Sequence, residues 1–446
     1  MADLDRIFTA YDVRGRADTG EIDADVAHAI GRAFASMVDE PAIAVGRDAR
    51  VSSPQLAEAL IAGVSAGGVD VWDLGLVATD VVYHVAGSEG VAGAMVTASH
   101  NPGEYNGIKL CRAGAAPVGE DTGLTAIRRL VDRPPPPVES PGTIVVRDAI
   151  APYVEHLFRV VPAPSIGRLS VVVDGGNGMA GVVLGPVFDR LEATLDGLYL
   201  EPDGRFPNHP ADPLQEENLV DLVERVRATG ADLGVAFDGD ADRAFFVDEL
   251  GDPLPGSTTT ALIARWFLAR RPGAGIVHNL ICSRSVPETI RAAGGTPIRT
   301  RVGHSFIKAV MAETGAVFGG EHSGHYYFAD NYRADSGMLA MLVLLRVLTE
   351  DGRPLSRLRR EVEPYHQSGE RNFTVDDVSA ATAAVAAAFP DTTVDHLDGL
   401  TVDVEDGWFN LRPSNTEPLL RLNLEAPDAA QCADRVAEVR TLFVGD

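Results

Sequence analysis

One plan recurs along this chain: a short β-rich run opens onto a Gly-rich or polar loop, and a helical stretch follows. Residues 42–75, 169–191 and 275–295 all show it. In the first of these segments, we expect Ser53 to cap a helix whose first turn contains Pro54. Alternation of strands and helices is typical of α/β units with parallel strands. We therefore expect three tandem, related α/β domains with mixed, largely parallel sheets.

The C-terminal part of the chain follows a different order. After Ser368 come a strand, an Ala-rich helix over 376–389, a group of strands that ends with 419–425, and a closing helix. Strands gathered between two helices predict a small α+β domain. The length of 446 residues suggests about three domains or more, and Pro134–Pro137 form a stiff extended spacer that marks a border. The predicted domains are 1–145, 146–250, 251–365 and 366–446.

The charge balance excludes some classes of partner. The net charge is −26, and the chain has no block rich in Lys or Arg. Affinity for nucleic acids and for anionic membranes begins with basic patches, so we expect neither as a partner. No apolar run approaches the roughly 18 residues that cross a bilayer. An anionic ligand would need basic contacts that are concentrated locally.

Cysteine usage indicates a reducing compartment. Cys111, Cys282 and Cys432 lie far apart in the sequence and lack the spacing of metal ligands. We expect three small buried hydrophobic residues rather than a disulfide framework. The N-terminus also lacks the basic-then-apolar pattern of a signal peptide. Together these features predict a cytoplasmic protein.

The segment Val96–Leu110, VTASHNPGEYNGIKL, follows a strand and is crowded with turn-forming residues. A serine that is held on a turn at a strand end can be presented to a cleft as a nucleophile, which makes Ser99 a candidate. His100 is its neighbour, and Lys109 supplies a cation from the same segment. The alternative is a polar connecting loop in which Ser99 only hydrogen-bonds its own backbone. Taken alone, this segment favours the alternative.

Asp238, Asp240 and Asp242 recur at every second position of FDGDADR, directly after the apolar run ADLGVAF. The small residues between them allow the loop to curl, so that three carboxylates converge on one point. Like charges at such short distances repel one another unless a cation lies among them. Hard oxygen ligands of this type suit Mg²⁺. The later Gly and the distant Glu of an EF-hand loop are missing. The alternative, a solvated acidic turn, is disfavoured by the apolar FFV that follows, and Arg243 beside the cluster suits a phosphoryl oxygen.

Two further loops carry polar groups suited to a phosphorylated sugar. In GGEHSGHYYF, residues 319–328, Glu321 and Ser323 offer an acceptor and a donor for vicinal hydroxyls, and a self-stabilising β-turn is an equal alternative. RPSNTEPLLRL, residues 412–422, is rich in donors, and Arg geometry matches phosphate oxygens. A surface turn with incidental arginines is the alternative, but an anion site explains such a loop better in so acidic a chain. The donors of this loop are Arg412, Ser414, Asn415, Thr416 and Arg421.

In this order along the chain, the four loops resemble those of the α-D-phosphohexomutase superfamily, and the likeness covers almost the whole chain. The segments IFTAYDVRG, GRD, DGGNGMAG and RFPNHPADP are also similar to that family. The most similar branch is the bacterial phosphomannomutase/phosphoglucomutase branch, and residues 278–308 resemble actinobacterial phosphomannomutases in particular. This resemblance implies three related α/β domains and a small fourth domain around a central cleft.

The resemblance also implies a role for each matching position. Ser99 matches the phosphorylated serine, and the three aspartates match a loop that, with that serine, holds one Mg²⁺ per active site. Glu321 and Ser323 match the sugar-binding loop, and the donors within 412–421 match the phosphate-binding loop. Basic residues that line the family's cleft are matched by Lys109, Arg243, His304 and His325. Further substrate contacts match Tyr11, Arg14 and Gly303.

The implied reaction is the reversible conversion of mannose 6-phosphate into mannose 1-phosphate through a phosphoserine enzyme. Hexose 1,6-bisphosphate is the implied intermediate and activator, hexose phosphates are the expected partners, and we expect a monomer or homodimer. Lys109 or His304 is the candidate for managing the hydroxyl proton, and the near-neutral pKa of histidine favours His304. The alternatives are a phosphoglucomutase or phosphoglucosamine mutase of the same superfamily, a metal-dependent sugar phosphatase and a catalytically silent sugar-phosphate sensor.

Two positions depart from the pattern of some relatives. Those relatives have a lysine at the position of Ile281 and an arginine near Ser257, and this chain has neither. Arg284 and Arg301 are the candidates for replacing the lost contact to phosphate or sugar. The preferred sugar depends on this replacement.

Overall fold

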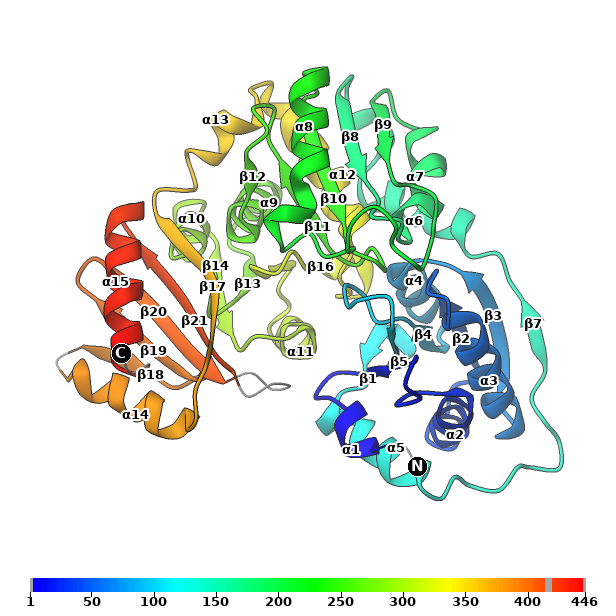
Figure 1. Cartoon of the computed structure of the whole chain (residues 1–446). Helices are drawn as coiled ribbons and strands as arrows, with labels where there is room; N and C mark the ends of the chain where they lie inside the picture. The colour runs from blue at the N-terminus through cyan, green and yellow to red at the C-terminus, as the bar shows by residue number, and fades with distance from the viewer. Residues whose placement is uncertain (1–2, 391, 414–418, 444–446) are drawn as a thin grey trace.

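The computed structural model describes residues 3–390, 392–413 and 419–443, and it contains four β-sheets that follow one another along the chain. Figure 1 shows them as an arc that runs from the blue N-terminal part through green and yellow to the orange and red C-terminal part. The first three sheets are mixed and carry helices, and the fourth is antiparallel with two helices. The predicted fold class is therefore confirmed.

The first sheet has the order β1-β5-β4-β2-β3-β7, in which β2, β3, β4 and β7 are parallel and β5 is antiparallel to β1 and β4. Its strands are β1 (Val13–Arg16), β2 (Ala42–Arg47), β3 (Asp70–Leu76), β4 (Ala92–Val96), β5 (Tyr105–Arg112), β6 (Ala116–Pro117) and β7 (Ile144–Val146). Its helices are α1 (Leu4–Ile7), α2 (Ala24–Ala35), α3 (Ser53–Ala66), α4 (Thr79–Glu89) and α5 (Leu124–Val131). β7 lies beyond the Pro134–Pro137 spacer and still joins this sheet, and the predicted domain borders stay predictions.

The expected cap of α3 is wrong. The helix begins at Ser53, and its N-cap residue is Ser52, whose side chain makes no capping hydrogen bond. The hydroxyl of Ser53 donates to the buried carboxylate of Asp48 instead. The Ser53 side chain therefore hydrogen-bonds Asp48 instead of capping the helix as the local pattern predicts.

The second and third sheets repeat the combination of parallel strands with an antiparallel edge. The second has the order β12-β11-β10-β8-β9, and the third has the order β14-β13-β15-β16. The strands are β8 (Ser170–Asp174), β9 (Thr194–Leu198), β10 (Leu233–Phe237), β11 (Ala244–Val247), β12 (Pro253–Leu254), β13 (Gly275–Asn279), β14 (Thr296–Thr300), β15 (Phe318–Gly320) and β16 (Tyr326–Phe328). The helices are α6 (Ile150–Val160), α7 (Ala180–Phe188), α8 (Val220–Thr229), α9 (Gly256–Arg270), α10 (Ser285–Ala292), α11 (His304–Thr314), α12 (Gly337–Asp351) and α13 (Leu355–Arg359).

The fourth sheet has the order β17-β21-β20-β19-β18. Its strands are β17 (His366–Thr374), β18 (Thr393–Asp395), β19 (Leu400–Val404), β20 (Gly407–Pro413) and β21 (Leu419–Ala426), with the helices α14 (Val378–Ala388) and α15 (Ala429–Thr441). This order of strand, helix, strand group and closing helix is the one predicted for the C-terminal part.

Three motif loops occupy equivalent places in the first three sheets. Each connects a strand to the antiparallel strand that follows it: β4 to β5, β10 to β11, and β15 to β16. The described ends of the fourth motif lie on the antiparallel strands β20 and β21. A hairpin connection at a strand end places its side chains beyond the edge of the sheet rather than in the core. The recurring plan of the sequence thus repeats the position of the functional loop as well as the strands.

Two of the hydrophobic clusters show how the sheets are grouped. One large apolar cluster draws side chains from the first three sheets, from Ala42 to Val362. The fourth sheet has its own core, which includes Val385, Leu411 and Leu422. The three cysteines are free and buried, as predicted. Among the described residues, the helices are too short or too polar to cross a membrane.

Candidate active site

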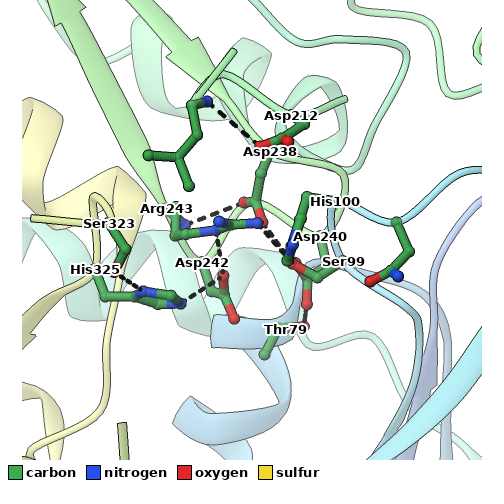
Figure 2. Close-up of polar contacts among 12 residues, drawn as sticks. Thr79, Ser99, His100, Asp212, Asp238, Asp240, Asp242, Arg243, Ser323 and His325 are labelled. Atoms are coloured by element: carbon green, nitrogen blue, oxygen red, sulfur yellow. Dashed lines mark hydrogen bonds and ion pairs between the residues drawn. The ribbon is translucent and has the colours of Figure 1, made fainter. Parts of the chain in front are cut away.

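Ser99 lies in the β4–β5 loop with a left-handed backbone (φ 51°) and a buried side chain. A non-glycine residue in this region persists only where its surroundings hold it. The N–H of Ser99 donates to Oγ1 of Thr97 at 2.9 Å. Its hydroxyl points toward the β10–β11 loop (Figure 2) and donates to Oδ2 of Asp238 at 2.6 Å. Two loops that are far apart in sequence therefore meet at this hydroxyl.

The three aspartates of the β10–β11 loop converge as predicted. Asp238, Asp240 and Asp242 are at most 1% exposed, and one oxygen of each lies within 4.8 Å of the other two. Gly239 permits the close approach of the loops, because a Cβ there would lie 2.3 Å from the carbonyl oxygen of Ser99. Sequence reasoning assigned this glycine to the curl of its own loop and missed the contact.

The aspartate cluster has the chemistry of a divalent-cation site. Oδ1 of Asp240 and Oδ1 of Asp242 are buried and find no hydrogen-bond partner among the described residues. Burying a carboxylate oxygen that accepts no hydrogen bond costs free energy, because the oxygen loses its contact with water. A bound hard cation offsets this cost by coordinating the oxygen. The hydroxyl of Thr79, at the start of α4, donates to Asp240 and fixes its orientation (Figure 2). The residues present therefore fit a bound Mg²⁺.

Lys109, on β5, crosses to the aspartate loop. Its Nζ donates to Oδ2 of Asp240 at 2.7 Å and to Oδ2 of Asp242 at 2.6 Å. Burial alone would lower the pKa of Lys109, but the two carboxylates raise it above its ordinary value. The ammonium group therefore stays charged.

Arg243 connects the remaining aspartate to the serine. The arginine is 2% exposed, and its Nε donates to Oδ2 of Asp238 at 2.8 Å while Nη2 donates to Oγ of Ser99 at 3.2 Å (Figure 2). Burial raises the pKa of Asp238 to about 7, against the opposing charge of Arg243. The guanidinium lies where it can contact the oxygens of a phosphate on Ser99.

His325 lies at the start of β16, on the open side of the aspartate loop. Its Nδ1 lies 3.1 Å from Oγ of Ser323, and its Nε2 lies 3.7 Å from Oδ1 of Asp242 (Figure 2). Burial lowers the pKa of His325 below its ordinary value. The structure thus brings His325 and Ser323 to the cluster that contains Ser99.

His304 is the first residue of α11, and its ring lies 5.4 Å from the ring of Tyr11. Burial, followed by the charge of Lys308, lowers the pKa of His304 to about 4. The near-neutral pKa on which the sequence-based preference for His304 depended is therefore wrong. The ring is unprotonated at pH 7 and is able to accept a proton.

Glu321 is oriented at both of its carboxylate oxygens. Oε1 accepts hydrogen bonds from Nδ2 of Asn279 at 3.0 Å and from the N–H of Gly303 at 3.2 Å, and Oε2 accepts one from the hydroxyl of Tyr327 at 2.7 Å. Asn279 and Tyr327 escaped sequence reasoning. A polar residue at the end of a buried parallel strand, as Asn279 is on β13, is the signal that could have found the first of them.

The N-terminal contacts bridge the first and third sheets. The hydroxyl of Tyr11 donates to the carbonyl oxygen of Val302 at 3.2 Å. Gly303 has φ 129°, and a Cβ there would lie 2.6 Å from the Tyr11 hydroxyl oxygen, so only glycine allows this contact. Nη1 of Arg14 donates to Oδ1 of Asn101 in the Ser99 loop at 2.5 Å.

Arg412 and Arg421 are paired across β20 and β21. Both bind one carboxylate that sequence reasoning missed: Nη2 of Arg412 lies 2.8 Å from Oε2 of Glu370, and Nη1 of Arg421 lies 3.2 Å from Oε1. Burial lowers the pKa of His322, in the Glu321 loop, to about 4, and the charge of Arg412 is the next cause. The predicted residues Ser414, Asn415 and Thr416 lie outside the described residues.

Ile281, where some relatives have a lysine, and the candidate replacements Arg284 and Arg301 all have identifiable contacts in the structure. Ile281 is buried against Trp408 of the fourth sheet. Arg284 forms an ion pair with Asp403, so its guanidinium is committed to the contact between the third and fourth sheets. Arg301 stacks on Phe306, with 4.4 Å between the guanidinium carbon and the ring centre. It lines a cavity of about 490 Å³ that Tyr11 also lines, and its role as a replacement stays a prediction.

Comparison with known families places all four parts of the chain. The family models for phosphoglucomutase/phosphomannomutase match in order: alpha/beta/alpha domain I at residues 5–135, domain II at 151–251, domain III at 255–365, and the C-terminal domain at 370–442. These matches cover most of the chain.

Whole-chain relatives agree. The chain is 41% identical over 444 residues to a protein of Xanthomonas campestris pv. campestris named phosphohexose mutases, covering 98% of this chain and 99% of the relative. It is 40% identical over 438 residues to a phosphomannomutase of Salmonella montevideo, with 94% of each chain covered. The crystal structure of a phosphoglucomutase/phosphomannomutase family protein from Burkholderia thailandensis has a TM-score of 0.89 at 35% identity and covers 99% of this chain and 98% of its own. The chain therefore belongs to the phosphoglucomutase/phosphomannomutase family of the α-D-phosphohexomutase superfamily and is an intramolecular phosphotransferase.

Proposed function

We propose that this enzyme is a phosphomannomutase that interconverts mannose 6-phosphate and mannose 1-phosphate through phosphorylated Ser99 and a hexose 1,6-bisphosphate. The observation that carries the proposal is the 2.6 Å hydrogen bond that joins Ser99 to the buried aspartate loop. The identity of about 40% to phosphomannomutases supports mannose as the sugar. Phosphoglucomutase is the second candidate, because the Xanthomonas relative carries the broader name phosphohexose mutases.

In the first transfer, the free hydroxyl of the bound hexose phosphate attacks the phosphorus on Ser99. The P–Oγ bond breaks, a P–O bond to the sugar forms, and the hydroxyl proton goes to a nearby base. We assign that base to His304, because its buried Nδ1 has no hydrogen-bond partner among the described residues and can accept a proton. Lys109 stays protonated and, with Arg243, balances the charge of the transferring group. Held by the three aspartates, Mg²⁺ would supply further neutralisation of the phosphoryl oxygens.

The far end of the substrate needs a separate site. Arg412 and Arg421, with the donors of 414–416, would hold the phosphate that is not being transferred. Glu321 and Ser323 would bind vicinal sugar hydroxyls, which a hexose presents in either orientation. The bisphosphate can then turn over and return its other phosphoryl group to Ser99.

The test is the phosphate content of the enzyme. Incubation with hexose 1,6-bisphosphate should add one phosphate to the wild-type chain by intact mass, and Ser99→Ala should take none and lose at least about 10³-fold in turnover. Ser36→Ala, a control at the end of α2, should behave as the wild type does. Full activity of Ser99→Ala would end the proposal.

Substrate choice needs a comparison of three sugars. We expect turnover of mannose 1-phosphate to exceed that of glucose 1-phosphate and glucosamine 6-phosphate, and chelation of divalent ions to abolish all three activities. Rapid release of inorganic phosphate without stimulation by the bisphosphate would identify a sugar phosphatase instead. A cytoplasmic location and a monomeric or homodimeric state remain predictions.

A further inference from the structure

Arg50 is fully buried and belongs to none of the motif loops. It follows β2, and its side chain extends to the Ser99 loop. A guanidinium has five N–H donors, and here all five are used. Nε donates to Oδ2 of Asp48 at 3.1 Å. The other four donate to the backbone carbonyl oxygens of Ser99 (2.7 Å), Asn101 (2.6 Å), Pro102 (2.6 Å) and Tyr105 (3.0 Å).

Four carbonyls of one turn thus point at a single cation. The planar, rigid fork of an arginine matches such a divergent set of acceptors, whereas a lysine offers three donors from one point. The first of the four carbonyls is that of the nucleophile itself. Since Ser99 has a left-handed backbone, contacts on both sides of it are needed to hold that conformation.

The other side of Ser99 is held by the same network. Asp48 accepts the hydrogen bond of Arg50 Nε and also one from Oγ1 of Thr97 at 2.7 Å. Oγ1 of Thr97 in turn accepts the N–H of Ser99 at 2.9 Å. The N–H and the C=O of the nucleophile are therefore both tied to the Asp48–Arg50 pair.

Phe206, in the segment that follows β9 of the second sheet, covers one face of the Arg50 guanidinium. The ring of Phe206 lies 5.1 Å from the guanidinium carbon of Arg50, within cation–π range. The Ser99 loop is consequently anchored to a group that both of the first two α/β units enclose. Among the described residues, Arg50 makes no hydrogen bond to Oγ of Ser99 or to Asp238, Asp240 and Asp242.

We propose that Arg50 is the positioning residue of the nucleophile: it fixes the backbone of 99–105 so that the Ser99 hydroxyl meets the aspartate loop. The proposal rests on the role of Ser99 given above. It assigns Arg50 to the transfer step alone, because the Glu321 loop and the Arg412 pair lie on other sheets. Loss of the fork should lower kcat and leave the KM for the hexose phosphate nearly unchanged.

The experiment compares Arg50→Lys with Arg359→Lys. Arg359 is a matched control, since it also bridges carboxylates and backbone carbonyls, those of Asp252 and Pro253, away from Ser99. We expect Arg50→Lys to slow phosphorylation of Ser99 by hexose 1,6-bisphosphate at least about tenfold by intact mass, with the KM within about threefold. Amide hydrogen exchange in a peptide covering 97–106 should accelerate in Arg50→Lys and stay unchanged in Arg359→Lys.

Two results would overturn the proposal: phosphorylation of Arg50→Lys at the wild-type rate, or an equal slowing in Arg359→Lys, which would indicate a general loss of stability. If Arg50→Lys does not fold, Phe206→Ala at a half-exposed site removes the cover of the guanidinium, and a rate unchanged from the wild type would count against the proposal. A wild-type chain that takes no phosphate on Ser99 would refute the proposed function, whereas the exchange of 97–106 would still decide the role of Arg50.

Discussion

The Ser99–aspartate cluster and the arginine pair of the fourth sheet both lie at the ends of antiparallel hairpins, yet they are held differently. The cluster is buried, and its two loops are connected by the ion pairs of Lys109 with Asp240 and Asp242 and by the hydrogen bond from Arg243 to Ser99. In the arginine pair, the side chains are 9% and 27% exposed, and each arginine forms an ion pair with Glu370. The difference agrees with the proposed function, in which the buried cluster is the preorganised transfer centre and the arginine pair is a more open site for the distal phosphate.

The surroundings of the two regions differ in the same way. The first three sheets share one apolar core, so they cannot separate without exposing it. The fourth sheet has a separate core, and its contacts with the third sheet include the ion pairs of Arg284 with Asp403 and of Arg299 with Asp395. Polar contacts of this kind exchange with water at little cost. The apolar contact between these sheets, formed by Leu280, Ile281 and Trp408, is far smaller than the shared core, so we expect the fourth sheet to move when the site closes.

We expect the largest loss of activity from a substitution in the buried Ser99–aspartate cluster. Arg243→Lys keeps the charge but loses the geometry that reaches both Asp238 and Ser99, so we expect kcat to fall about 10²–10³-fold. Steady-state kinetics with mannose 1-phosphate measure this fall in kcat. Arg225→Lys, at an exposed arginine paired with Asp196, is the control and should retain activity. A kcat within about twofold of the wild type for Arg243→Lys would contradict a preorganised centre.

Acid should destabilise the shared core more than the fourth sheet. Burial is the first cause of the lowered pKa of seven histidines, all in the first three α/β units: His84, His100, His156, His278, His304, His322 and His325. Each stays neutral in the fold while the unfolded chain takes up a proton below about pH 6.5. Their contribution to stability is present above that pH and is lost as the pH falls toward about 4.

Four buried carboxyls act in the opposite sense, two of which are Asp48 and Glu425, whose pKa burial raises. Burial raises the pKa of Asp80 and of Asp238 to about 7, so their contribution is lost as the pH rises through 7. The histidines outnumber them, so we expect the free energy of unfolding to fall between pH 7 and pH 5. Urea unfolding followed through Trp72 and Trp266 in single-tryptophan variants should show it, with a smaller shift at Trp408. A larger shift at Trp408 would reverse the comparison.

A smaller effect is expected at the distal phosphate site. Arg412→Lys should raise the KM for mannose 1-phosphate about tenfold and change kcat by less than about threefold, because it removes fork geometry from a group that binds but does not react. Arg371→Lys, at an exposed position on the neighbouring β17, is the control. A fall in kcat with an unchanged KM would place Arg412 in the transfer step instead.

The smallest effect is expected between the third and fourth sheets. Arg284→Ala removes a partly exposed ion pair with Asp403, and such pairs contribute less than about 1 kcal/mol. Thermal unfolding of the variant should therefore stay close to that of the wild type. A drop of several degrees would show that the fourth sheet is attached more firmly than its contacts suggest.

Local patterns predicted the parts of the site that few residues define. The aspartates converge because three carboxylates on a five-residue turn with small spacers have little choice. The strands and helices around the loops follow from periodicity within short windows. The failures lie where a distant partner intervenes: Ser53 was assigned to a helix cap but binds Asp48, and burial moved the pKa of His304 to about 4.

By itself, the sequence determined the repeated strand–loop–helix plan, the aspartate spacing and, through its likeness to a known family, the choice of Ser99 as the candidate nucleophile. Only the tertiary structure decided that Ser99 meets Asp238, that Glu370 binds two arginines and that Arg50 holds the nucleophile's turn. The reason is physical. Periodicity and turn chemistry act between near neighbours in the chain, whereas a buried polar group takes whichever partner the packing of separate sheets places within about 3 Å.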